Sequence, residues 1–162
     1  MPVVAPRDTI AVSLRLANVY GPRQSAQGEA GVVAIFAERM LAGGTIEIHG
    51  DGLQTRDFVY VDDVASAVVA ASRAKMGAAV NIGTGCETSI LKLFELMSAT
   101  TSFAGQLVFT HARAGDVRRG ALDPAAAGAA LGWRASVGLV EGIDRTLASY
   151  RNAAGRRSTP SS

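Results

Sequence analysis

Short runs of apolar, β-branched residues alternate along this chain with segments in which apolar residues recur at helical spacing. Ile10 to Leu16 is such a run and ends in a turn, whereas residues 31–42 carry apolar side chains on one helical face and charged side chains on the other. The alternation repeats toward the C-terminus. It is typical of α/β proteins, in which helices connect the strands of a mostly parallel sheet. The sequence therefore predicts the α/β class and a buried first strand.

The same patterns predict the remaining elements. Strands are expected at 10–16, 45–48, 56–61, 79–82 and 106–110. Helices are expected from Gly31, after Asp62-Asp63, from an N-terminal Thr88-Ser89, and after an N-cap at Asp123 with Pro124 in the first turn. A last helix carries Val140, Ile143, Leu147 and Tyr150 on one face. A carboxylate of the Asp62-Asp63 pair is expected to cap its helix. The chain is thereby divided into a lead-in over 1–9, a structured region over 10–150 and a flexible tail over 151–162.

Length, charge and cysteine content exclude several classes of protein. The 162 residues have room for one ordinary domain. Sixteen Lys and Arg against fourteen Asp and Glu leave a net charge of +2, which is too small for a broad nucleic-acid surface. No apolar run reaches the roughly 18 residues of a membrane span, so no membrane partner is expected. Cys86 is the one cysteine, which favours a reducing cytoplasm, and neither His49 nor His111 has partners at a metal-ligand spacing, so no metal is expected.

Four segments, taken in order, carry a more specific pattern. They are Leu14-Arg-Leu-Ala-Asn-Val-Tyr-Gly-Pro-Arg-Gln24, Gly50-Asp-Gly-Leu-Gln-Thr-Arg-Asp-Phe-Val-Tyr-Val-Asp-Asp-Val64, Asn81-Ile-Gly-Thr-Gly85, and Arg113-Ala-Gly-Asp-Val-Arg-Arg119 followed by Leu131-Gly-Trp133. Together they cover about residues 10 to 150. In this order, they resemble the second half of the extended short-chain dehydrogenase/reductase family, the NAD-dependent nucleotide-sugar epimerases and dehydratases, and most closely its UDP-glucose 4-epimerase members.

The resemblance implies the C-terminal part of an extended Rossmann-type, NAD(P)-binding epimerase fold, with the closing strands of the parallel sheet and a smaller α/β substrate domain. The family's Gly-x-x-Gly-x-x-Gly cofactor loop and Tyr-x-x-x-Lys catalytic pair lie upstream of the Asn-Val-Tyr-Gly-Pro segment, and neither occurs in these 162 residues. Gly83-Thr-Gly85 lacks the third glycine and the later acidic residue of a cofactor loop. We therefore expect no catalytic residue and no turnover from this chain alone. NAD binding is expected only if the missing N-terminal half is supplied, and the open edge of the first strand is expected to form a homo-oligomer or to pair with that half.

The resemblance also implies a substrate site for a UDP-sugar or a related nucleotide sugar. The diphosphate of such a ligand requires cationic donors in a fixed geometry, and arginine suits that role best. By similarity, Arg56 and Arg113 each reach the diphosphate, although they come from stretches far apart in the sequence. Asp116, by the same comparison, accepts hydrogen bonds from the ribose.

Two further stretches are implied to contact the ligand or the cofactor. Asn18 resembles the family's asparagine at the sugar-phosphate end. The backbone of Ala17 and Val19 is implied to lie near the nicotinamide. Glu47 to His49 resembles the extended edge along which the family lays the uracil ring, with only its backbone placement implied.

Each of these residues also has a purely structural interpretation. Arg56 and Asp57 are adjacent and would suit an exposed ion pair. Asn18 would suit any turn that ends a strand. Arg118 and Arg119 are expected to form a solvated edge, although a shift of one turn would exchange one of them for Arg113. Three aromatic residues are expected in the core rather than in catalysis: Tyr20, Phe58 and Tyr60.

Three functions are compatible with these observations. The first is the substrate-binding half of a nucleotide-sugar 4-epimerase. The second is the same region of a dehydratase, decarboxylase or reductase, which the motifs separate poorly from an epimerase because the clamp on the nucleotide sugar is shared. The third is a non-catalytic module that binds nucleotide sugars or a partner.

Overall fold

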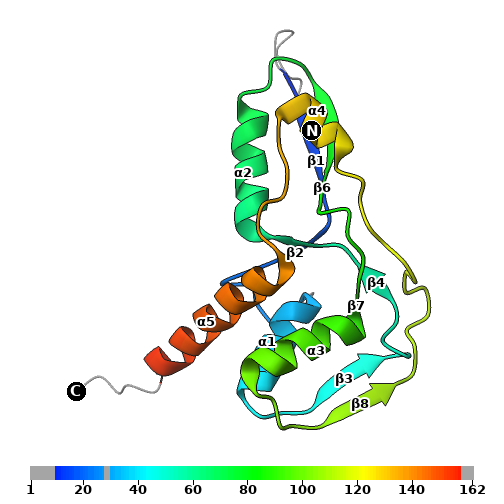
Figure 1. Cartoon of the computed structure of the whole chain (residues 1–162), viewed down its shortest axis with the longest axis vertical. Helices are drawn as coiled ribbons and strands as arrows, with labels where there is room; N and C mark the ends of the chain where they lie inside the picture. Colours follow the sequence, from blue (N-terminus) through cyan, green and yellow to red (C-terminus); the bar gives the residue numbers. More distant parts are fainter. Residues whose placement is uncertain (1–9, 28–29, 158–162) are drawn as a thin grey trace, which may run out of the picture.

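The computed structural model describes residues 10–27 and 30–157, which form eight strands and five helices (Figure 1). The strands are β1 (Val12–Leu16), β2 (Asn18–Tyr20), β3 (Ile46–His49), β4 (Thr55–Arg56), β5 (Phe58–Tyr60), β6 (Ala78–Ile82), β7 (Thr88–Ser89) and β8 (Leu107–Thr110). The helices are α1 (Val32–Leu41), α2 (Val61–Ser72), α3 (Ile90–Thr101), α4 (Ala125–Leu131) and α5 (Leu139–Arg157). The predicted α/β class is confirmed. The lead-in expected over 1–9 lies outside the described residues.

The strands pair two by two. Three pairs are parallel, β1 with β6, β2 with β5 and β3 with β8, whereas β4 and β7 are antiparallel. The single strand expected over 56–61 is instead two strands, β4 and β5, and Val61 already begins α2. Asp57 lies between the two strands, which belong to different pairs because β4 pairs with β7 and β5 with β2. Parallel pairing places the carboxyl ends of both partners at the same edge, so the loops after β3 and β8 start side by side.

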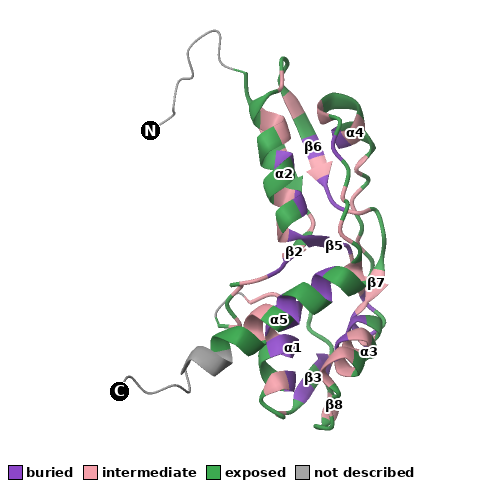
Figure 2. Cartoon of the chain, turned by 60° about the vertical axis from the view of Figure 1, so that its left-hand side comes forward, coloured by how far each residue is buried: buried purple, intermediate pink, exposed green. Residues whose placement is uncertain are grey.

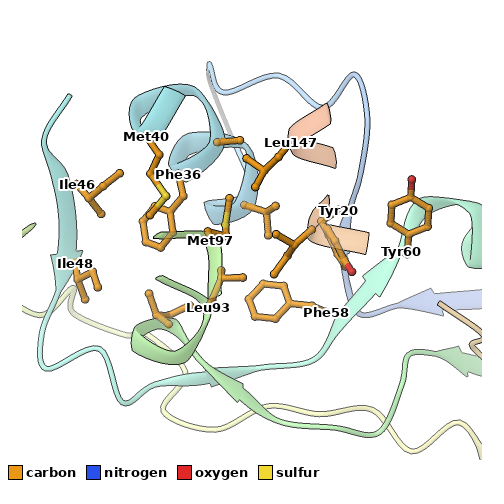
Figure 3. Close-up of a cluster of buried hydrophobic side chains, with 14 residues drawn as sticks. Tyr20, Phe36, Met40, Ile46, Ile48, Phe58, Tyr60, Leu93, Met97 and Leu147 are labelled. Atoms are coloured by element: carbon orange, nitrogen blue, oxygen red, sulfur yellow. The ribbon is translucent and has the colours of Figure 1, made fainter. Parts of the chain in front are cut away.

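The larger apolar core lies in the lower part of the molecule as drawn in Figures 1 and 2. Here α1, α3 and α5 pack on one another and against β3 and β5. Figure 3 shows the buried side chains that fill this space. Tyr20 meets the rings of Phe58 and Tyr60 edge-on, with centroids 6.3 and 5.6 Å away, so the predicted core position of all three aromatics is confirmed. Burial raises the pKa of Tyr20, whose hydroxyl donates to the Leu139 carbonyl at 3.4 Å.

A second, smaller cluster joins α2 and α4 to the β1–β6 pair. The expectation that β1 is buried is wrong. Val12 and Leu14 are half-buried, while the other three residues are exposed and Leu16 retains 48% of its accessible surface. Within the described residues β6 is the one strand that pairs with β1, so its other edge is open. The α2 side of β1 is covered, so alternate residues such as Val12 and Leu14 are half-buried there, whereas the residues that point the other way are exposed.

The start of α3 agrees with its sequence signal, whereas α4 starts one residue later than predicted. The Ser89 hydroxyl accepts a hydrogen bond from Lys92 N at 3.0 Å, which confirms the predicted N-cap. The Asp123 carboxylate accepts from Ala125 N at 2.9 Å, but the N-cap of α4 is Pro124, which has no side-chain cap, so the N-cap predicted at Asp123 is wrong by one residue. The helix ends at Gly132 in the left-handed region with φ of 63°, as expected. A side-chain hydrogen bond therefore fixes the start of α3, and a left-handed glycine fixes the end of α4.

The other two predictions about helix ends need correction. No side chain caps α2, because Asp62 and Asp63 lie within its first turn and the buried Asp63 carboxylate faces another segment. On α5, Ile143 and Leu147 are buried as expected, but Val140 is 56% exposed. This helix also continues to Arg157, beyond the boundary drawn at 150, and the remainder of the expected tail, 158–162, lies outside the described residues.

Candidate functional site

His49, the first candidate residue, is the last residue of β3 and lies at the edge where β3 and β8 end. Its ring lies beside Thr110 in the strand register, and His49 Nδ1 is 2.7 Å from the Thr110 hydroxyl. The His49 carbonyl accepts from the Gln54 side chain at 2.8 Å. The Arg113 guanidinium lies 2.8 Å from His49 Nε2. Because a guanidinium only donates, Nε2 must accept, and the Nδ1 proton is then donated to Thr110.

Arg56 reaches the same loop from β4. Its Nη1 donates to the Val117 carbonyl at 2.5 Å and to the Thr55 carbonyl at 2.7 Å, and its Nη2 forms an ion pair with Asp116. Asp116 follows Arg113 in a turn, in which Asp116 N donates to the Arg113 carbonyl at 3.2 Å. The structure therefore brings Arg56, Arg113, Asp116 and His49 together through one loop. The alternative of an Arg56–Asp57 ion pair is wrong, since Arg56 pairs with Asp116 instead.

Polar contacts hold this loop, the segment 111–122, against the rest of the chain. It runs from β8 toward α4 in Figure 1, without regular secondary structure and with mostly exposed side chains. Arg118 binds both oxygens of Asp51 at 2.7 and 2.9 Å, and Arg119 binds both oxygens of Glu87 at 3.0 and 3.1 Å. The Arg118 carbonyl also accepts from Thr55 N at 3.0 Å. The two arginines expected to form a solvated edge are thus exposed but paired.

These pairs predict how the segment responds to acid. The hydrogen bond from Arg118 lowers the pKa of Asp51 to about 2, and that from Arg119 lowers the pKa of Glu87. A carboxyl whose pKa is lowered by folding stabilises the folded form above its unfolded pKa, about 3.9 for Asp, and loses that effect as the pH falls through the folded value. We therefore expect the Arg118–Asp51 tether to loosen between about pH 4 and pH 2. An NMR titration of the Asp51 carboxyl carbon should show a midpoint near 2 in the native chain and a higher one in Arg118→Ala, where the hydrogen bond from Leu53 N remains. Equal midpoints would contradict the assignment.

A buried carboxylate, Asp57, lies just behind Arg56. It is 2% exposed and accepts hydrogen bonds from the Thr84 backbone and hydroxyl, Gly85 N and Leu122 N, at 2.5 to 3.2 Å. A Cβ at Gly83 would lie 2.4 Å from Asp57 Oδ2, which explains why a glycine ends β6. Asp57 therefore joins β4, the Gly83-Thr-Gly85 turn and the end of the segment 111–122. The sequence did not predict these contacts, because the partners of Asp57 lie 27 to 65 positions away in the chain.

The remaining candidate residues lie outside this contact network. Asn18 is exposed in β2, one strand away, where its backbone N donates to the Asp57 carbonyl at 2.8 Å. The Glu47 carboxylate is bonded to Arg39 of α1 at 3.3 Å, so its side chain is engaged elsewhere. Ala17 and Val19 lie immediately beyond the carboxyl end of β1.

A separate hollow of about 1010 Å³ lies between the end of β6, α4 and residues 134–139. Small residues line much of it, and its charged lining residues are Asp123 and Arg134. None of the candidate residues above contributes to its lining. Within the described parts of the chain, no three His, Cys, Asp or Glu side chains lie close enough to hold a metal ion, and no helix is long and apolar enough to cross a membrane.

Comparison with known proteins gives a consistent result. The model of the NAD dependent epimerase/dehydratase family matches residues 5–83. The UDP-glucose 4-epimerase of Mycolicibacterium smegmatis is 49% identical over 84% of this chain and 44% of its own length. Other relatives bear the names of nucleotide-sugar dehydratases and decarboxylases.

Solved structures show the same relationship. A UDP-glucose 4-epimerase of Thermotoga maritima, solved with UDP-glucose, superposes with a TM-score of 0.86 and 46% identity, over 88% of this chain and 46% of that chain. A UDP-glucose 4-epimerase of Thermus thermophilus, solved with NAD, superposes with a TM-score of 0.81 and 41% identity, over 88% of this chain and 47% of that chain. The predicted fold, the C-terminal part of a Rossmann-type epimerase, is confirmed. The chain spans less than half the length of these relatives.

Proposed function

Because this chain belongs to the NAD-dependent epimerase/dehydratase family, we propose that it is the substrate-binding part of a nucleotide-sugar 4-epimerase of the UDP-glucose/UDP-galactose type. One observation carries the proposal: Arg56, 57 positions from Arg113 in the sequence, is bonded to Asp116 and Val117 of the same exposed loop that carries Arg113. Such an arrangement suits a ligand that carries two adjacent negative charges.

The diphosphate binds at the two guanidinium groups. Among the described residues Arg113 forms no ion pair, and its ring partner His49 is an uncharged acceptor in the arrangement above, so the Arg113 charge is not neutralised within the chain. Arg56 is fixed on one side by two backbone carbonyls, which hold the guanidinium plane in place. A planar cationic donor that is already oriented loses little conformational entropy when it binds phosphate.

The nucleoside then lies along the edge where β3 and β8 end. Asp116 is placed to accept hydrogen bonds from the ribose hydroxyls, and the backbone near His49 lies beside the uracil. Asn18 approaches the sugar-phosphate end from β2, with an exposed side chain that is available to a ligand. The Glu47 side chain takes no part, because its carboxylate is paired with Arg39.

The nicotinamide ring of NAD would bind at the sheet edge beyond β1. Ligands of open α/β sheets bind beyond the carboxyl ends of the strands, where Ala17 and Val19 lie. Ala17 N already donates to the Ile82 carbonyl at 2.9 Å, and the Val19 carbonyl accepts from Gln24 at 3.1 Å, so these backbone groups are satisfied within the chain. The two half-buried side chains therefore offer an apolar contact for the nicotinamide. When bound, NAD accepts and returns the hydride of the sugar.

A second candidate is the equivalent region of a nucleotide-sugar dehydratase or decarboxylase. It is favoured by the relatives that bear those names, at 31% to 34% identity over 85% to 86% of this chain. The higher identity to the 4-epimerases supports the first proposal. Both candidates use the same clamp on the diphosphate.

Calorimetric titration with UDP-glucose tests the proposed site. The native chain is expected to bind, and Arg56→Ala is expected to lose about 1.5 to 3 kcal/mol of binding free energy, roughly a 10- to 150-fold weakening, because one charge-assisted contact is removed. The matched control is Arg39→Ala, which removes the same charge from an exposed ion pair with Glu47. It should change affinity less than twofold, by about 0.4 kcal/mol at most. Equal effects of both variants would remove Arg56 from the site.

A further inference from the structure

The ion pair between Arg56 and Asp116 joins two residues that the proposed function assigns to different parts of one ligand. Arg56 would bind the diphosphate and Asp116 the ribose, yet here each is the partner of the other. The pair is more sheltered than the neighbouring Arg118–Asp51 pair, with side-chain exposures of 20% and 32% against 60% and 52%. The Asp116 carboxylate therefore binds Nη2 of the same Arg56 guanidinium that the proposed function assigns to a phosphate oxygen.

We propose that Asp116 is a specificity-determining residue that competes with phosphate for Arg56, so that the site selects diphosphates carrying a ribose over bare inorganic anions. This inference rests on the proposed function of the site. An anion that approaches Arg56 must displace the carboxylate or bind beside it and suffer like-charge repulsion, which is larger where solvent is partly excluded. The displaced carboxylate in turn needs new hydrogen-bond donors.

A ribose supplies those donors. Its two neighbouring hydroxyls can each donate to one carboxylate oxygen, so a nucleoside diphosphate compensates Asp116 for the loss of Arg56. Inorganic pyrophosphate meets the same guanidinium groups but offers no such diol. Only a nucleotide ligand compensates for the loss of the Arg56–Asp116 ion pair. The ion pair therefore lowers the affinity for inorganic pyrophosphate more than for a nucleoside diphosphate.

The surroundings give Asp116 room to exchange partners. It lies in the turn that begins at Arg113, and Gly115 in that turn has a φ of 78°. Apart from Gly115 and its two neighbours in the chain, no described atom lies within 4 Å of where a Gly115 Cβ would be, so this turn is open on that side. The flanking contacts, Arg113 to His49 and Arg118 to Asp51, do not involve Asp116. The carboxylate can therefore turn away from Arg56 while the loop stays tethered at both sides.

Titrations with inorganic pyrophosphate and with UDP-glucose test this competition in the full chain. Asp116→Asn is expected to bind pyrophosphate about tenfold tighter or more than the native chain, because Arg56 is no longer neutralised. Its affinity for UDP-glucose should not rise in parallel, since the variant also loses a charged acceptor for the ribose. The matched control is Asp51→Asn, which removes the same charge and frees Arg118 on the same loop. It should change pyrophosphate affinity less than about twofold.

A double variant, Arg56→Ala with Asp116→Asn, identifies the guanidinium that is involved. The gain for pyrophosphate should disappear in it. Failure of Asp116→Asn to tighten pyrophosphate, an equal gain in Asp51→Asn, or a gain that persists without Arg56 would each overturn the inference, while binding of UDP-glucose by the native chain would leave the proposed function in place. Absence of UDP-glucose binding by the native chain would instead reject the proposed function and the ribose-dependent selectivity, whereas tighter pyrophosphate binding by Asp116→Asn would still assign the competing role to Asp116.

Discussion

Asp57→Ala is expected to lower the free energy of unfolding by about 3 to 5 kcal/mol, because several buried donors would be left without an acceptor. The carboxylate accepts from the backbone of Thr84, Gly85 and Leu122 and from the Thr84 hydroxyl. A loss of this size is a large fraction of the total stability of a small domain. Urea unfolding followed by circular dichroism measures it directly.

A milder variant and a control keep the Asp57 experiment decisive if alanine prevents folding. Asp57→Asn retains one acceptor oxygen and should fall between the native chain and Asp57→Ala. Asp51→Ala removes an exposed carboxylate of the neighbouring turn, which accepts from Arg118 and from Leu53 N. It should shift the urea unfolding midpoint far less than Asp57→Ala does, because an exposed ion pair contributes little. An unfolding midpoint of Asp57→Asn that matches the native chain would show that the buried contacts contribute little.

Asp63→Ala is expected to cost about 2 to 4 kcal/mol and to release residues 134–138 from α2. The buried Asp63 carboxylate accepts from Ser136 N at 3.0 Å, the Ser136 hydroxyl at 2.7 Å and Val137 N at 3.0 Å. The neighbouring Trp133 donates its indole N–H to the Asp63 carbonyl at 3.0 Å. Tryptophan fluorescence therefore reports the local change, while urea unfolding gives the loss of stability.

Asp62 provides a matched control for Asp63. It is the preceding residue on the same helix, its side chain is 68% exposed, and its partner Arg145 is 3.8 Å away. Asp62→Ala should change stability by about 0.5 kcal/mol or less and leave the Trp133 spectrum unchanged. The same cost for both variants would mean that Asp63 stabilises the fold through helix charge rather than through its contacts with Ser136 and Val137.

The elements that local sequence determines were predictable. Ser89 caps its own helix through a hydrogen bond from Lys92 N, so a pattern of two or three residues identifies this start. The helices and the strands β1, β3, β6 and β8 followed from the period of their apolar residues, whereas β2, which lies in the expected turn, and β7 were not predicted. The α/β class followed from their alternation, because local periodicity and global fold agree here.

Interactions between distant segments were not predictable in the same way. From sequence alone, Asp57 resembles half of an exposed ion pair and Asp63 resembles a helix cap. Both carboxylates instead accept hydrogen bonds from backbone N–H groups much later in the chain, those of Leu122 and Ser136. The exposure of β1 depends on which strands lie beside it, which its own sequence does not state. For Arg56, the partner Asp116 is 60 positions away, and only the fold brings the two together.

The candidate site itself shows both cases. The resemblance to a family identified Arg56, Arg113 and Asp116, because motifs record residue types at fixed positions. It did not indicate that Arg56 would be paired with Asp116, or that the His49 ring would contact Arg113. Those contacts depend on the course of the segment 111–122, which lacks the periodicity that allows strands and helices to be predicted.

A crystal structure of this chain with UDP-glucose is the most direct test of the site. We expect both guanidinium groups, those of Arg56 and Arg113, to donate to oxygens of the same diphosphate at about 2.7 to 2.9 Å, with Asp116 turned to the ribose. A diphosphate bound away from these two side chains, or one that contacts Arg113 while Arg56 still holds Asp116, would contradict the account.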